Sequence, residues 1–179
     1  MIAGAAILTV FGAWWCIAAL ANWTERPGWS IPAASVTTIV LLVLCVLRLV
    51  ATRKIPSIDD PVAAAKGKRA GKLFGIIFGL EAGLIALCSI LLSSRGLGLW
   101  IPIAVAIIVG VHFLPLAHVF DVGLYYWTGA LSVLGVLGCL LIRDVNTRLL
   151  WVGLVMAGVL WLSVAVLLLQ TRHTQDPRV

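Results

Sequence analysis

The stretch that decides the fold runs from residue 71 to residue 93 and reads GKLFGIIFGLEAGLIALCSILLS. A helix needs about 20 mostly apolar residues to cross the hydrocarbon core of a bilayer, and this stretch is long enough. Its one acidic residue, Glu81, lies near the middle. Glycines recur at every fourth position: Gly71, Gly75, Gly79 and Gly83. The stretch therefore predicts a transmembrane helix with a carboxyl group at mid-bilayer and a ridge of small residues.

The chain as a whole has the composition of a polytopic membrane protein. Of its 179 residues, 62% are hydrophobic and 11% are charged, whereas a soluble domain has about 45–50% and about 25%. Six apolar stretches are long enough to span a bilayer, at about 2–21, 31–52, 71–93, 99–120, 122–142 and 149–169. Their continuous apolar runs indicate helices rather than barrel strands of alternating polarity. The predicted fold is all-α, with six transmembrane helices in one bundle that forms a single domain over residues 1–179.

The basic residues predict how the bundle is oriented. Nine of the thirteen lie on the side of the long connection at 53–70, namely Arg48, Arg53, Lys54, Lys66, Lys68, Arg69, Lys72, Arg172 and Arg178. The positive-inside rule places this side in the cytoplasm. We therefore expect a multi-pass protein of a bacterial inner (plasma) membrane with both termini cytoplasmic. The net charge of +6 does not indicate nucleic-acid binding, because the basic residues beside a membrane span orient the helix and attract anionic lipid.

Two local features refine this arrangement. Asp60 and Pro61 suit the cap and first turn of a helix, so the third helix is expected to begin at Pro61 and extend beyond the membrane. Trp14, Trp15 and Trp161 lie deeper than the tryptophans at the interfaces and are expected to pack within the bundle.

The glycine ridge predicts close helix packing. Small residues four apart allow the backbones of two membrane helices to approach each other. The neighbour is either another span of the chain or a second copy, which would make a homo-oligomer. Glu81 projects roughly 140° away from the centre of the ridge. Because neither face suits lipid, the third helix is expected in the interior of the bundle.

Glu81 is the first candidate functional residue. A charged group at the bilayer centre costs on the order of 3 kcal/mol on insertion scales, and such residues are functional by default. Three interpretations stay open at this point: a proton or cation relay, a residue that lines a small-molecule site, and a neutral acid that links two helices.

His112 and Pro115, in the fourth span, are the other candidates. Pro115 removes one helical hydrogen bond from the carbonyl of Val111 and predicts a kink beside His112. Counted from the inner edge, Glu81 lies at a depth of about 15 Å and His112 at about 12 Å. The third and fourth spans are joined by a short turn, so the two side chains are expected to meet as a proton-sharing pair. The alternative is that His112 bonds a backbone carbonyl.

Several kinds of site are not expected. The four cysteines stand singly in four different spans, which favours neither a disulfide framework nor a metal cluster. His112 and His118 share one helix, so a haem held by two histidines of facing helices is not expected either. The sequence has no phosphate loop and no GxSxG or HExxH motif. We expect no metal and no cofactor.

Three segments carry a family resemblance: residues 77–83 (IFGLEAG), residues 110–117 (GVHFLPLA) and residues 125–129 (YYWTG). Together they resemble a family of small uncharacterised bacterial integral membrane proteins with a carboxyl-bearing span and a G-x-H-F-x-P-L-A span. The resemblance implies that Glu81, His112 and Pro115 belong to the family pattern. It supplies no substrate.

Three classes of function follow from the sequence. The first is a small transporter or channel with a midplane Glu81–His112 site for an unidentified small molecule or ion. The second is a non-catalytic membrane protein, such as an assembly, stress or sensor component. The third, an intramembrane enzyme with Glu81 and His112 as acid and base, lacks a nucleophile or metal set.

Overall fold

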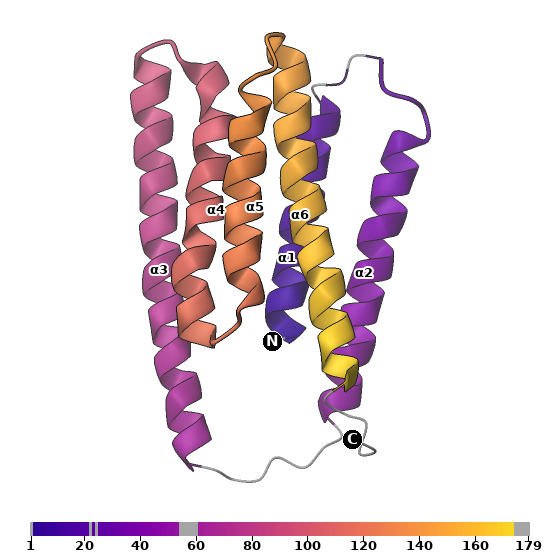
Figure 1. The fold of residues 1–179 in the computed structure, drawn as a ribbon, viewed down its shortest axis with the longest axis vertical. Helices are drawn as coiled ribbons and strands as arrows, with labels where there is room; N and C mark the ends of the chain where they lie inside the picture. Colours follow the sequence, from indigo (N-terminus) through magenta and orange to yellow (C-terminus); the bar gives the residue numbers. More distant parts are fainter. Residues whose placement is uncertain (1, 22, 24, 54–60, 174–179) are drawn as a thin grey trace. The chain divides into compact units, whose positions relative to one another are not determined.

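The computed structural model describes residues 2–21, 23, 25–53 and 61–173, and every regular element in these residues is helical (Figure 1). The elements are α1 (Ile2–Ala21), α2 (Ser30–Arg53), α3 (Pro61–Ser94), the 3-10 helix η1 (Gly98–Trp100), α4 (Ile101–Phe120), α5 (Leu124–Cys139) and α6 (Val145–His173). The all-α prediction is confirmed, and α3 begins at Pro61 as expected. Asp60 lies outside the described residues.

Five helices are long and apolar enough to cross a membrane: α1, α2, α3, α4 and α6. The remaining helix, α5, has 16 residues and is about 24 Å long, which is short of a hydrocarbon core of about 30 Å. Beyond it, the N–H groups of Leu140, Leu141 and Ile142 each bond the carbonyl three residues back. These tighter turns continue the helical winding of the backbone to residue 142, where the predicted span ends. A membrane protein is supported, and its sixth span stays a prediction.

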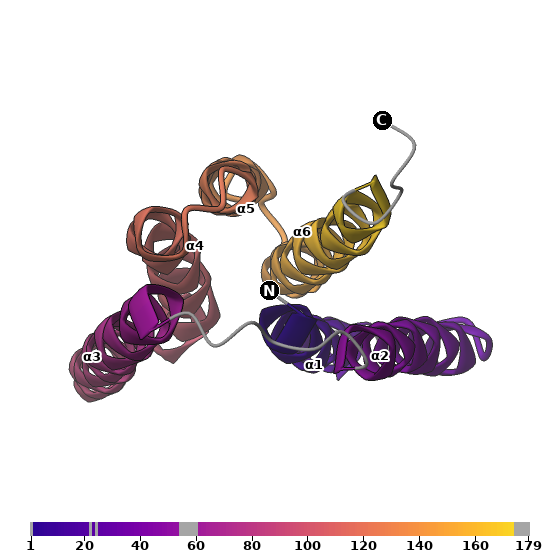
Figure 2. The ribbon, with the colours of Figure 1, turned by 90° about the horizontal axis from the view of Figure 1, so that it is seen from below.

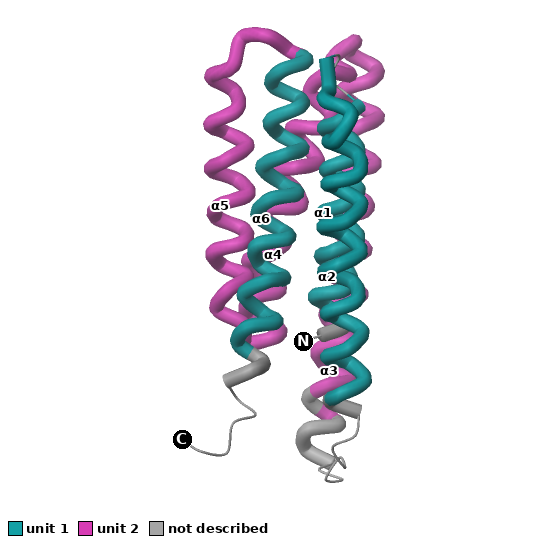
Figure 3. The backbone as a smooth tube through the Cα atoms, turned by 90° about the vertical axis from the view of Figure 1, so that its right-hand side faces the viewer, with its two compact units in different colours: residues 1–56, 146–179 teal, residues 57–145 magenta. Residues whose placement is uncertain are grey.

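The chain divides into two compact units, as Figure 3 shows in teal and magenta; the single domain expected from the sequence stays a prediction. One unit comprises Met1–Pro56 and Asn146–Val179 and contains α1, α2 and α6. The other, Ser57–Val145, contains α3, η1, α4 and α5.

In the first unit, α6 packs antiparallel to α1. A methyl group on Gly153 would lie 2.7 Å from both the Ala19 Cβ and the Trp15 carbonyl oxygen, so the two backbones are in close contact. Eight residues further along α6, the Trp161 indole N–H donates to the Thr9 carbonyl at 3.3 Å. Because residue numbers rise along α6 as they fall along α1, the two helices run in opposite directions.

The deep tryptophans have different environments. Trp15 is buried with 6% of its surface exposed, and Trp161 is half-buried beside α1. Trp14 is 68% exposed, so the prediction that it packs within the bundle is wrong. Consecutive helical residues project about 100° apart, and the α1 face that meets α6 therefore takes in Trp15 and leaves Trp14 outside.

In the second unit, α4 is the middle helix and packs against α3 on one side and α5 on the other (Figure 2). The α4–α5 contact is formed at two glycines. A methyl group on Gly129 would lie 2.7 Å from the Gly110 carbonyl oxygen, and one on Gly110 would lie 2.8 Å from the Val133 Cγ2. Because neither glycine has a side chain, the backbones of α4 and α5 can lie close together at this point.

The position of α3 differs from the prediction. Helix α3 packs on α4 and η1 within its unit, and none of its membrane-length segment Gly67–Ser94 is buried. It is therefore an edge helix of this unit and not an interior helix. The prediction assumed that a glycine ridge needs a protein neighbour, whereas apolar and small residues are also accommodated by lipid.

Candidate functional site

A tight turn after α3 brings the candidate residues together. Gly96 has a φ of 71°, in the left-handed region that glycine adopts without steric cost. The N–H of Leu97 bonds the Leu92 carbonyl at 2.8 Å, and that of Gly96 bonds the Ser93 carbonyl at 3.1 Å. This pattern closes the end of α3. The chain then reverses through η1, so α4 returns antiparallel beside α3.

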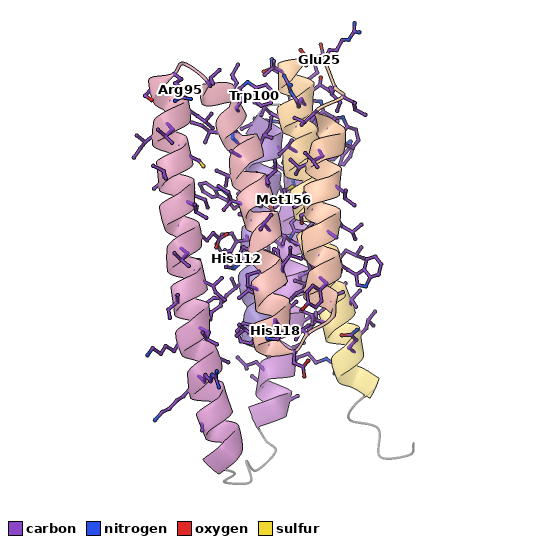
Figure 4. All side chains as sticks on the ribbon, turned by 60° about the vertical axis from the view of Figure 1, so that its left-hand side comes forward. Glu25, Arg95, Trp100, His112, His118 and Met156 are labelled. Atoms are coloured by element: carbon purple, nitrogen blue, oxygen red, sulfur yellow. The ribbon has the colours of Figure 1, made fainter. Side chains whose placement is uncertain are left out.

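The reversal places Glu81 opposite His112. The Nδ1 atom of His112 lies 3.2 Å from Oε2 of Glu81, and 10% and 11% of the two side chains are exposed, respectively. Figure 4 shows His112 on the side of α4 that faces α3. Glu81 is the middle residue of the membrane-length part of α3, Gly67–Ser94, and lies about 20 Å from either end. The contact predicted from depth is confirmed.

The contact is close but not linear. Its distance meets the criterion for an ion pair, yet the Nδ1 atom has no hydrogen-bond partner, because its N–H direction does not point at the carboxylate. The two groups are therefore close enough for an ion pair when His112 is protonated, and Nδ1 makes no hydrogen bond.

The pair can hold protons in more than one way. One proton on the imidazole gives an ion pair, and the same proton on the carboxyl gives a neutral pair. A second proton leaves one positive charge, and loss of the first leaves one negative charge. Because net charge in a bilayer is costly, uptake or release of a proton by the pair changes the free energy of keeping α3 and α4 in the membrane. This arrangement suits a proton or a small cation.

Apolar side chains surround the pair along the α3–α4 contact. On α3, Ile77 and Ile85 are half-buried, one turn before and after Glu81. Two turns away, the Phe74 ring lies 6.0 Å from the Phe120 ring of α4, measured between centroids. The α3 residues meet α4 residues in decreasing numerical order, which is the antiparallel register. Glu81 and His112 are thus a polar contact within an apolar seam.

Pro115 lies three residues after His112, and α4 continues through it to Phe120. Because proline has no N–H, the carbonyl of Val111 lacks its helical partner. This carbonyl belongs to the residue next to His112. The contact itself joins a carboxyl and an imidazole, and the freed carbonyl lies one residue away along the chain.

The glycine ridge belongs to a different face of α3. A methyl group on Gly71, Gly75, Gly79 or Gly83 would meet no atom within 4 Å among the described residues. The ridge is therefore exposed. It is not part of the Glu81–His112 contact, and its predicted packing role stays a prediction.

The remaining candidates lie apart from the pair. His118 is exposed near the end of α4. Asp121 ends that helix in a left-handed conformation, with a φ of 55° and its N–H on the Ala117 carbonyl. In the part of the chain that the structure describes, no three His, Cys, Asp or Glu side chains are grouped to hold a metal ion.

The sequence did not indicate a packing role for Gly110 and Gly129, the two glycines at which α4 and α5 are in close contact. A signal was present, since Gly129 and Ser132 place small residues three apart on α5. The signal is weaker than the four-residue repeat on α3, and it concerns two different helices. Gly110 lies on the face of α4 that points away from α3. Its contact with Gly129 fixes the position of α4, and therefore of His112, relative to α5.

The chain matches the model of a family of unknown function (DUF7010) over residues 63–170, which is more than half of its length. The chain belongs to this family. The matched segment contains Glu81, His112 and Pro115 and leaves out α1 and α2. This agrees with the resemblance to an uncharacterised family, whereas the particular motif stays a prediction. No curated protein and no solved structure matches the chain.

Proposed function

We propose that this DUF7010 protein is a small transporter or channel-like membrane protein whose Glu81–His112 pair binds a proton or another small cation at mid-bilayer. The observation that carries the proposal is the 3.2 Å contact between two ionisable groups on adjacent helices of membrane length. Ionisable residues at this depth are expensive and mark ion pathways more often than they serve packing alone.

The chemistry of the site supports a cation over an anion. The carboxylate of Glu81 is an oxygen acceptor, and carboxylate oxygens coordinate hard cations. Neutral His112 adds a nitrogen acceptor, and protonated His112 supplies a positive charge that a cation would have to replace. Binding of a cation at Glu81 is therefore coupled to release of a proton from His112.

Proton flux into proteoliposomes tests the proposal. The full-length protein is reconstituted with a trapped pH-sensitive dye, and a potassium diffusion potential set with valinomycin drives protons inward. We expect flux above that of protein-free vesicles, and we expect Glu81→Gln and His112→Asn each to lower it at least tenfold. Glu25→Gln, which removes an exposed acid in the α1–α2 loop, is the matched control and should leave flux unchanged.

Two results would contradict the relay: wild-type flux equal to that of empty vesicles, or full flux in the Glu81→Gln protein. The second candidate function, a non-catalytic assembly, stress or sensor component, would then be favoured. A specific observation supports this candidate, since the ridge of four glycines on α3 is exposed and can accept another helix.

The same ridge supports a homo-oligomer. Gly79→Leu would fill the ridge, and we expect it to lower the molecular mass measured by light scattering in detergent to that of the monomer. Leu80→Phe enlarges an exposed side chain that projects roughly 120° away from the centre of the ridge, and it should leave the mass unchanged. A wild-type protein that is already monomeric would exclude oligomerisation through this ridge under those conditions.

The orientation in a bacterial inner membrane is also proposed. It rests on the basic residues around the 53–70 connection and on the positive-inside rule. The test is the fluorescence of a green fluorescent protein fused to the C-terminus, which matures in the cytoplasm. If the fusion protein is made at full length but does not fluoresce, the C-terminus lies outside the cytoplasm and the proposed orientation is wrong.

A further inference from the structure

We propose that a groove between α1 and α2 binds one acyl chain of an anionic phospholipid, whose phosphate pairs with Arg26. The groove has a volume of about 490 Å³ and is lined by both helices and by Arg26 in the loop that joins them. This volume is within the range of about 300–1,000 Å³ that small-molecule sites occupy. The site lies within one compact unit, Met1–Pro56 with Asn146–Val179.

The length of the groove suits an acyl chain. Its lining extends from Ala13 to Ala21 on α1 and from Ile31 to Ile39 on α2. Eight residue steps on each helix amount to about 12 Å, and half of a hydrocarbon core of about 30 Å is about 15 Å. The groove therefore runs through most of one leaflet and has its loop end at the level of the headgroups.

The walls of the groove are mostly apolar, and their polar residues besides Arg26 are Ser35 and Thr38. The lining residues Ile17, Ile31 and Ile39 are exposed isoleucines. The hydroxyl of Thr38 donates to the Ala34 carbonyl of its own helix at 2.8 Å, so it needs no polar partner in the groove. An aliphatic chain fits this surface, because it gains contact with apolar atoms and leaves no wall hydroxyl of Thr38 unsatisfied.

Arg26 supplies the charge that selects the headgroup. Its Nη1 lies 3.5 Å from the Leu20 carbonyl, at the C-terminal end of α1, which holds the side chain over the groove. A guanidinium has five N–H donors and pairs with phosphate in a bidentate manner, so one long contact leaves donors for a lipid. The neighbouring acid Glu25 is exposed and does not line the groove. Figure 4 shows Glu25 at the loop end of the unit.

Native mass spectrometry of the full-length protein tests this site. The protein is released from micelles that contain equal amounts of phosphatidylglycerol and phosphatidylcholine. We expect one retained phosphatidylglycerol in preference to phosphatidylcholine. Arg26→Gln should lower this preference about fivefold, the contribution of one basic side chain at an anionic membrane surface. Arg95→Gln, an exposed arginine in the α3–η1 turn, is the matched control and should preserve the preference.

A second pair of variants tests the groove itself. Ala34→Phe places a ring in the groove and should abolish retention of the lipid, whereas Ala33→Phe, on the adjacent residue outside the lining, should not. Far-UV circular dichroism checks that both variants are folded, and the Arg26 variant tests the proposal if Ala34→Phe fails this check. Equal lipid preference in wild type and Arg26→Gln would overturn the proposal. So would a cross-link from Ile17→Cys to residues 57–145 or to a second copy, since protein would then fill the groove.

Discussion

Replacing Gly129 with alanine should destabilise the protein through one defined contact. The added methyl group would lie 2.7 Å from the Gly110 carbonyl oxygen and 3.3 Å from the Phe113 Cβ. The nearest of these atoms belongs to a backbone, which cannot rotate away as a flexible side chain does. Helices α4 and α5 must therefore move apart. Overpacking of this kind costs about 1–3 kcal/mol.

A matched glycine on the same helix separates this clash from other effects of alanine. A methyl group on Gly138 would meet no atom within 4 Å. Gly138→Ala removes the conformational entropy of glycine, and in a helix this is favourable by up to about 1 kcal/mol. The two variants make the same chemical change in α5, so we expect them to shift stability in opposite directions.

Thermal unfolding of the full-length protein in detergent, followed by circular dichroism, measures both effects. For a chain of this size, about 2 kcal/mol corresponds to a fall in Tm of about 4–8 °C. Gly129→Ala should show this fall, and Gly138→Ala should leave Tm unchanged or slightly higher. Equal shifts in the two variants would refute the close α4–α5 contact, because the cost would then not depend on the neighbouring backbone.

Three further outcomes follow from other contacts. Gly153→Ala should lower Tm by a similar amount, because its methyl group would meet the α1 backbone at 2.7 Å, whereas Gly158→Ala, with no atom within 4 Å, should not. Trp161→Phe should lower stability by about 1 kcal/mol, since it removes an indole hydrogen bond to an α1 carbonyl; no change would mean that water or lipid replaces this bond at no cost. A double-mutant cycle of Glu81→Gln and His112→Asn should give a coupling of about 0.6–1.7 kcal/mol in unfolding experiments, and additive effects would deny an energetic link across the contact.

The sequence was informative about the candidate site because the site places an acidic residue in a membrane span, where charged residues are rare. Glu81 is the one acidic residue between Pro61 and Phe120, so hydropathy identified it at once. Counting residues along two helices joined by a short turn gave the depth of His112. Depth along a helix follows from a fixed rise per residue, and the 3.2 Å contact agrees with that count.

The same reasoning failed for the faces of the helices. The four glycines of α3 form the more regular pattern, yet close contacts with another helix occur at Gly12, Gly110, Gly129 and Gly153. In a soluble protein, an apolar face indicates the core. In a membrane protein, lipid and protein interior are both apolar, so the pattern does not distinguish them.

The sequence by itself determined that the chain is helical and suited to a membrane, where its helices lie to within a few residues, and at what depth Glu81 and His112 lie. These properties depend on apolar runs, helix geometry and local turn residues, all of which are local. Only the tertiary structure decided that the chain divides into two units, that α3 lies at the edge of its unit, and that α4 is held between Glu81 on one side and the α5 backbone on the other. Those properties depend on which side chains meet across helices, and a bilayer gives no difference in polarity from which to predict them.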